Sequence, residues 1–77
     1  MICYVDGSEV RGGDRVDYDG WQAVVHEVID TPEKSREWGL KEQGVMFETE
    51  EAGLVFENSQ NSTWQAIRLL GRLEDNN

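Results

Sequence analysis

Short stretches rich in apolar, β-forming residues recur along the chain, and polar turn-forming residues separate them. Six segments have this character: 2–5, 15–18, 22–30, 45–49, 54–57 and 67–73. Short runs of this kind with turn signals between them are typical of strands. Between the second and third segments, Asp19-Gly20 tolerates the positive φ that a tight hairpin turn requires. The pattern therefore predicts five or six short antiparallel strands, and the first long hairpin turns at Asp19-Gly20.

A second hairpin is predicted over residues 45–57, with Gly53 supplying the left-handed residue of its turn. We expect its inward-facing side chains to be the large apolar ones, Val45, Phe47, Leu54 and Phe56.

Residues 31–43 interrupt the strand pattern and form an insertion, which we expect to be a loop or a short helix. Thr31 suits the N-cap of a helix, Pro32 suits its first position, and Gly39 suits its end. A helix this short is unstable in isolation. It is therefore expected to dock through Trp38 or Leu40, or to stay mobile.

The chain has 77 residues, enough for one domain with a single small core. The fold class predicted is an all-β small barrel of five to six antiparallel strands with one short helical insertion, because closing the sheet protects its edges. The single domain spans residues 1–77, and residues 74–77 are expected to form a frayed tail.

The charge balance restricts the class of partner. Sixteen acidic residues against seven basic ones give a net charge of −9. Such a surface repels nucleic acids and anionic membranes, whereas it attracts a basic protein. We therefore predict a basic protein partner, no nucleic acid and no membrane, with the chain itself a monomer or a weak homodimer.

The sequence offers little for catalysis. The chain has one cysteine and one histidine, too few for a structural zinc site, and Asp17-x-Asp19 lacks the further ligands of a calcium loop. His26 has no nucleophile beside it, and no cation near Cys3 would activate that thiol. We predict no catalytic residue, metal or cofactor. A lone cysteine and a start without a signal-peptide pattern favour the cytoplasm.

Gly13-Asp14-Arg15-Val16, followed by Asp19-Gly20 and Ala23-Val24-Val25, resembles the opening hairpin of SH3-like barrels, including the KOW type. The resemblance covers about eighteen residues and implies an SH3-like barrel. KOW-type domains commonly bind RNA or ribosomal and transcription components through basic residues. This chain departs from them, because acidic residues occupy the comparable strands and turns.

The whole chain also resembles the small, acidic SH3-like immunity proteins found beside bacterial toxins. That likeness includes a Gly-Val-Met-Phe strand over 44–47 and a Gly-Leu-Val-Phe partner over 53–56. It implies a protein that binds and inhibits a toxin.

The candidate partner-binding residues are acidic or tryptophan side chains placed on strands and turns. They are Asp17, Asp19, Trp21, Trp38, Glu48, Glu50, Glu51 and Glu57. Trp21 is the first candidate for an interface anchor, because tryptophan combines apolar area with a polar nitrogen. Each tryptophan is equally compatible with a place in the core.

The functional hypothesis is therefore a stoichiometric inhibitor or immunity protein that covers a basic protein such as a nuclease toxin. One alternative is an adaptor that binds a peptide or larger assembly through Tyr18, Trp21 and Trp64. A second alternative is an RNA- or translation-associated barrel of the KOW type.

Overall fold

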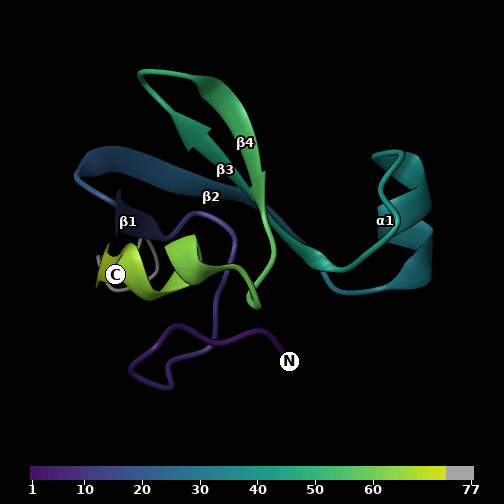
Figure 1. Cartoon of the computed structure of the whole chain (residues 1–77), viewed down its shortest axis with the longest axis horizontal. Helices are drawn as coiled ribbons and strands as arrows, with labels where there is room; N and C mark the ends of the chain where they lie inside the picture. Colours follow the sequence, from purple (N-terminus) through teal and green to yellow (C-terminus); the bar gives the residue numbers. More distant parts are fainter. Residues whose placement is uncertain (73–77) are drawn as a thin grey trace.

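The computed structural model of the protein describes residues 1–72. Five strands form one antiparallel sheet, in which the strands lie in the order β4-β3-β2-β1-β5 (Figure 1). The elements in chain order are β1 (Arg15–Tyr18), β2 (Trp21–Ile29), α1 (Pro32–Glu37), β3 (Gly44–Thr49), β4 (Gly53–Glu57), the 3-10 helix η1 (Ser62–Ala66) and β5 (Ile67–Gly71). The prediction of an all-β fold with one short helical insertion is confirmed.

The first of the six predicted segments, residues 2–5, forms no strand of the sheet. Within residues 1–14 the strand-type pairing is a single bridge between Cys3 and Glu9. The end of the predicted last strand at Leu73, and the tail 74–77, lie outside the described residues.

The turn between β1 and β2 has the predicted geometry. Asp19 and Gly20 both have positive φ, 49° and 94°, as a primed two-residue turn requires. The Asp17 carboxylate accepts a hydrogen bond from the Gly20 amide at 2.9 Å, which holds the turn closed.

The sheet is strongly curled, and its core lies inside the curl. The Tyr18 hydroxyl on β1 donates a hydrogen bond to the Glu57 carboxylate at the end of β4, although β3 and β2 lie between these strands. In a flat sheet, strands three places apart would be about 14 Å from one another. The fully buried side chains Val16, Val25 and Phe47 fill the space that the curl encloses.

The aromatic core continues into the segments outside the sheet. Trp64 of η1 is buried against Phe47 at a ring distance of 6.2 Å and against Tyr4 at 6.5 Å. Its indole nitrogen donates to the Cys3 carbonyl at 3.0 Å. Trp64 therefore ties the N-terminal segment and η1 to the sheet.

Buried Asp14 organises the rest of the N-terminal segment. Its carboxylate accepts hydrogen bonds from the Tyr4 hydroxyl at 2.7 Å, the Arg11 amide at 2.9 Å and the Arg72 guanidinium at 3.1 Å. Burial and the Asp14 carboxylate together raise the pKa of Tyr4.

The prediction of which side chains in the second hairpin face the core is half wrong. Val45 and Phe47 are buried as expected, whereas Leu54 is 48% exposed. Thr49 pairs with Gly53, and this register places Val55 opposite Phe47 on the core side and Leu54 opposite Glu48 on the other side. Leu54 and Phe56 therefore occupy the opposite face from Val55, because side chains alternate along a strand.

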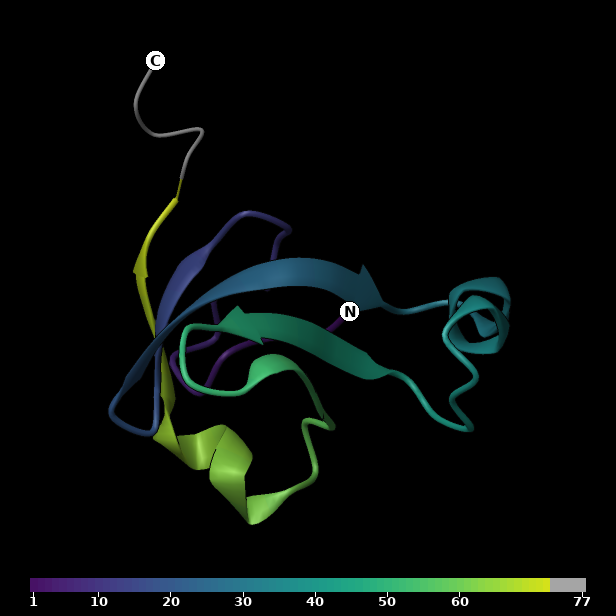
Figure 2. The ribbon, with the colours of Figure 1, turned by 90° about the horizontal axis from the view of Figure 1, so that it is seen from above.

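The insertion forms α1, and its ends match the expected signals. The Thr31 side chain caps the helix by accepting a hydrogen bond from the Lys34 amide at 3.2 Å, and Gly39 has a positive φ of 70° after its end. Figure 2 shows α1 standing to one side of the sheet, beyond the ends of β2 and β3.

Trp38 connects this arm, residues 30–43, to the sheet. Its indole nitrogen donates to the Glu27 carboxylate at 3.0 Å, and its ring meets the His26 ring edge to face at 5.8 Å. Of the alternatives left open for the insertion, which were docking through Trp38, docking through Leu40 or mobility, the structure shows contact through Trp38. Within the described part of the chain, no helix is long and apolar enough to cross a membrane.

Candidate binding groove on the outer face of the sheet

The side chains that point away from the core form a second, solvent-facing surface of the sheet, which we call the outer face. Cross-strand pairing sets one row of neighbours across this face, running from Leu54 through Glu48 and Val24 to Arg15. Val24 and Leu54 are 39% and 48% exposed, and Leu70 of β5 is 59% exposed. Exposed apolar side chains and charged side chains therefore follow one another across the outer face.

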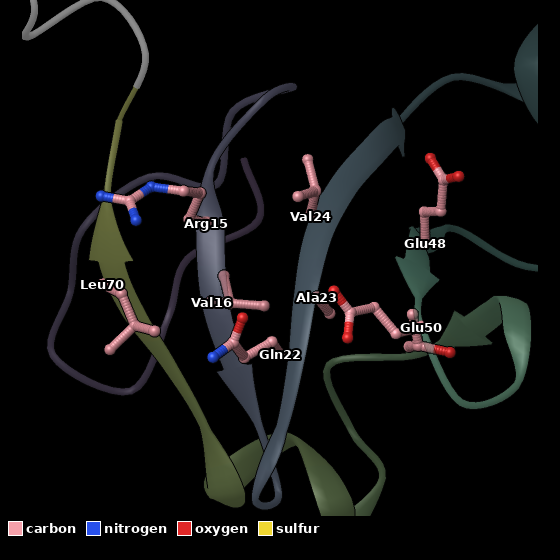
Figure 3. A pocket seen from close by; sticks show the side chains of 9 residues that line it. Arg15, Val16, Gln22, Ala23, Val24, Glu48, Glu50 and Leu70 are labelled. Atoms are coloured by element: carbon pink, nitrogen blue, oxygen red, sulfur yellow. The ribbon is translucent and has the colours of Figure 1, made fainter.

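A cleft of about 340 Å³ lies in the outer face, and we call it the sheet groove. Figure 3 shows Glu48 and Glu50 on the β3 side of this groove and Arg15 and Leu70 on the opposite side. The other residues labelled there come from the strands between them: Val16 from β1, and Gln22, Ala23 and Val24 from β2. The sheet groove therefore combines apolar walls with charges of both signs.

The negative charges of the two carboxylates in the sheet groove are not neutralised by any side chain among residues 1–72. Glu48 and Glu50 are both exposed, and within residues 1–72 neither has a hydrogen bond or an ion pair to its side chain. Each therefore keeps its full attraction for an incoming cation, reduced only by solvent and salt.

The position of Glu50 is fixed by the turn that follows β3. The Thr49 hydroxyl accepts a hydrogen bond from the Ala52 amide at 2.9 Å and donates one to the Gly53 carbonyl at 3.0 Å. Because Thr49 is buried, this hydroxyl holds the turn against the sheet. Glu50 is thereby held at the rim of the sheet groove, and Glu51 is exposed in the same turn.

Arg15 lies at the other end of the sheet groove. Its guanidinium covers Gly71 of β5 so closely that a Cβ on that glycine would lie 2.8 Å from the arginine nitrogen. Gly71 therefore leaves room for the cation, and within the described residues Arg15 has no carboxylate partner.

The eight predicted site residues do not form one surface. Glu48 and Glu50 line the sheet groove, and Asp17, Asp19 and Glu51 lie in or beside turns. Trp38 holds the arm. Asp17 is partly buried as a turn cap, which leaves Asp19 and Glu51 as exposed turn charges.

The predicted anchor Trp21 does not lie in the outer face. Alternation along β2 places Trp21 with Ala23 and Val25 on the core side, where its ring stacks on Tyr18 at 6.3 Å. Trp21 is still 43% exposed, at the end of the hairpin. It is therefore separated from Glu48, which points to the other side of the sheet.

Glu57 is the one predicted site residue that the fold removes from the surface. It is only 8% exposed, because the register places it opposite Val45 on the core side. Its carboxylate accepts hydrogen bonds from the Tyr18 hydroxyl and from the Asn61 side chain, the latter at 3.3 Å. Glu57 therefore has a structural role. Burial of Tyr18 and its hydrogen bond to Glu57 raise the pKa of that tyrosine.

The aromatic platform of the adaptor alternative is also not formed. Tyr18 and Trp64 are both buried, with exposed fractions of 7% and 4%, so only Trp21 of the three offers a ring to a ligand.

The sequence reasoning missed four exposed residues that line the groove: Arg15, Gln22, Val24 and Leu70. The alternation within β2 carried a signal for two of them, since Gln22 and Val24 flank the inward Ala23. That Val24 is exposed beside Glu48 depends on the cross-strand register, which alternation within one strand does not determine.

Among residues 1–72, no three His, Cys, Asp or Glu side chains are grouped closely enough to hold a metal ion. Comparison of the chain with protein-family models, with curated proteins and with solved structures gives no match. The sheet groove and the charge of the chain are therefore the features that bear on function.

Proposed function

We propose that this chain is a stoichiometric binding protein that covers a basic protein, such as a nuclease toxin, and inhibits it by occlusion. The observation that carries the proposal is the pair of uncompensated carboxylates, Glu48 and Glu50, beside exposed apolar side chains in the sheet groove. The carboxylates would take the place of a nuclease's phosphate ligands. The net charge of −9 would speed the encounter by long-range attraction.

The proposal includes an SH3-like fold of the immunity-protein type, and a cytoplasmic location for the complex. The curled sheet, in which β1 reaches β4 through Tyr18 and Glu57, supports such a barrel. A standard interface takes about 800 Å² from each partner. The outer face, which spans all five strands, would supply part of that area.

The proposal is tested by capturing partners from the native cell with the tagged chain and identifying them by mass spectrometry. A basic protein whose binding weakens steeply between low and high salt supports the proposal. Retention of RNA, or of an apolar peptide-like partner without salt dependence, contradicts it in favour of the translation-associated or adaptor alternatives.

Charge reversal then shows which surface of this chain binds the captured partner. The triple variant Glu48→Lys, Glu50→Lys, Glu51→Lys should fold normally, since all three side chains are exposed, and should lose partner binding. Unchanged binding by this variant would rule out the outer face as the interface.

The arm supplies a control with the same change in charge. Glu33, Glu37 and Glu42 are exposed residues of the arm, away from the sheet groove. Their reversal to lysine changes the net charge equally, and should lower affinity only through the weaker long-range field. A loss as large as that of the groove variant would show that net charge alone drives binding.

A further inference from the structure

The two ends of the sheet groove carry opposite charges. Glu48 and Glu50 make the β3 end negative, whereas the end near β1 and β5 carries the Arg15 guanidinium beside the exposed Leu70. Val24, between the two ends, supplies an apolar wall. A ligand that matches this groove carries a cation at one end and an apolar group at the other.

We propose that the sheet groove binds an extended segment of the basic partner in which an arginine or lysine and a large apolar residue lie four positions apart. The cation would lie at Glu48 and Glu50 and the apolar side chain against Leu70. This inference rests on the proposed function, since it names the part of the partner that the groove takes.

The spacing follows from the order of the strands. β3 and β5 are separated by three strand intervals, through β2 and β1. Measured along the curved surface of the sheet, three intervals correspond to about 14 Å, and four residues of an extended chain that follows this surface span about the same length. Residues four apart on an extended chain also point to the same side, so both side chains can enter the sheet groove.

Arg15 disfavours a second cation in the segment. A cation four residues from the first would approach the Arg15 guanidinium, which within residues 1–72 has no carboxylate to neutralise it. Like charges at close range disfavour the wrong ligand. The groove therefore selects one cation and one apolar residue, although the net charge of the chain favours any polycation.

A second copy of the chain fits the groove less well. Each copy carries a net charge of −9, so two copies repel each other over their whole surfaces. Charge complementarity favours the basic segment as the occupant.

The test compares the affinities of two short peptides. Binding in the sheet groove and general charge attraction predict opposite orders of affinity for them. The probes are acetyl-Arg-Ser-Ser-Ser-Leu-amide and acetyl-Arg-Ser-Ser-Ser-Arg-amide, titrated into the ¹⁵N-labelled full chain at physiological ionic strength. The proposal predicts that the arginine–leucine peptide binds more tightly, by about fivefold, and shifts the amide signals of the groove residues. General attraction predicts the reverse, because the second peptide carries two charges.

The variant Glu48→Gln/Glu50→Gln removes both carboxylates and should weaken the arginine–leucine peptide by about tenfold, because charge-assisted contacts are lost. The matched control Glu33→Gln/Glu37→Gln makes the same change in net charge on α1 and should leave binding within about twofold. In Arg15→Gln, the preference for the arginine–leucine peptide should disappear. The amide spectrum of each variant also reports whether it is folded.

Three results would each overturn the proposal. The doubly charged peptide could bind the wild-type chain more tightly, or the groove and arm variants could weaken binding equally. The third is that the peptide shifts only amide signals on other surfaces. Concentration-dependent shifts of the groove residues without peptide would assign the groove to a second copy instead. These results are separable from the proposed function, because a basic partner captured from cells could still bind elsewhere. Conversely, peptide selection by the groove stands even if the captured partner is not a nuclease.

Discussion

The Tyr18 hydroxyl donates a hydrogen bond to the buried Glu57 carboxylate and so joins two strands that are not neighbours in the sheet. Replacing Tyr18 with phenylalanine keeps the ring contacts with Phe47 and removes the donor. Among residues 1–72 the carboxylate then keeps only its contact with Asn61, so we expect the free energy of unfolding to fall by about 2 kcal/mol. Urea unfolding followed by circular dichroism measures this loss, and an unchanged midpoint would contradict the structural role of the pair.

The two buried tyrosines predict a sensitivity to alkaline pH. The pKa values of Tyr4 and Tyr18 are raised in the folded chain by burial and by their carboxylate partners, whereas an unfolded tyrosine titrates near pH 10. The unfolded state therefore loses these protons first. The stabilisation is fully present below about pH 10 and is lost as the pH rises further toward the raised folded values.

This expectation is measured by thermal unfolding between pH 8 and about pH 12, with tyrosinate absorbance recorded in parallel. The double variant Tyr4→Phe/Tyr18→Phe should be less stable at neutral pH and should lose less stability above pH 10. A steeper alkaline loss in the double variant than in the wild-type chain would contradict this account.

Gly44, at the start of β3, has no room for a side chain. A Cβ there would meet the Phe56 ring at 2.6 Å and would also collide with the Glu57 carbonyl. Gly44→Ala should therefore destabilise the chain by about 2 kcal/mol, through displacement of Phe56 and of β4. Gly12→Ala is the matched control, because a Cβ at Gly12 meets nothing within 4 Å. Equal unfolding midpoints for the two variants would contradict the packing described for Gly44.

The arm should open independently of the sheet. Because α1 stands to one side and Trp38 holds it through Glu27 and His26, removal of that side chain should free the arm without unfolding the core. Trp38→Ala should raise amide hydrogen exchange by about tenfold over residues 31–43 and leave β2 and β3 protected. Equal acceleration across the sheet would show that the arm is part of the cooperative core.

Much of the fold could be predicted because its signals are local. Asp19-Gly20 determines its turn through backbone conformation alone, and Thr31 and Pro32 mark the start of α1 through capping geometry. These features need only a few neighbouring residues, so the sequence carries them directly.

The candidate site could be predicted only in part, because it depends on register and curl. The Thr49 and Gly53 pairing turns Leu54 outward and Glu57 inward, and no pattern within β4 distinguishes this arrangement from its opposite. Trp21 likewise lies on the other side of the sheet from Glu48, a relationship set by alternation along β2 together with its pairing to β3.

The arm stands to one side of the sheet (Figure 1), and it is attached through Trp38 and through the Lys34 ammonium, which donates a hydrogen bond to the Val28 carbonyl at 3.3 Å. A fluorescent dye placed on the exposed Lys41 in the arm would therefore leave the proposed interface untouched. The molecule thus offers a reporting position that a bound partner would not bury, from which association can be followed by changes in tumbling rate.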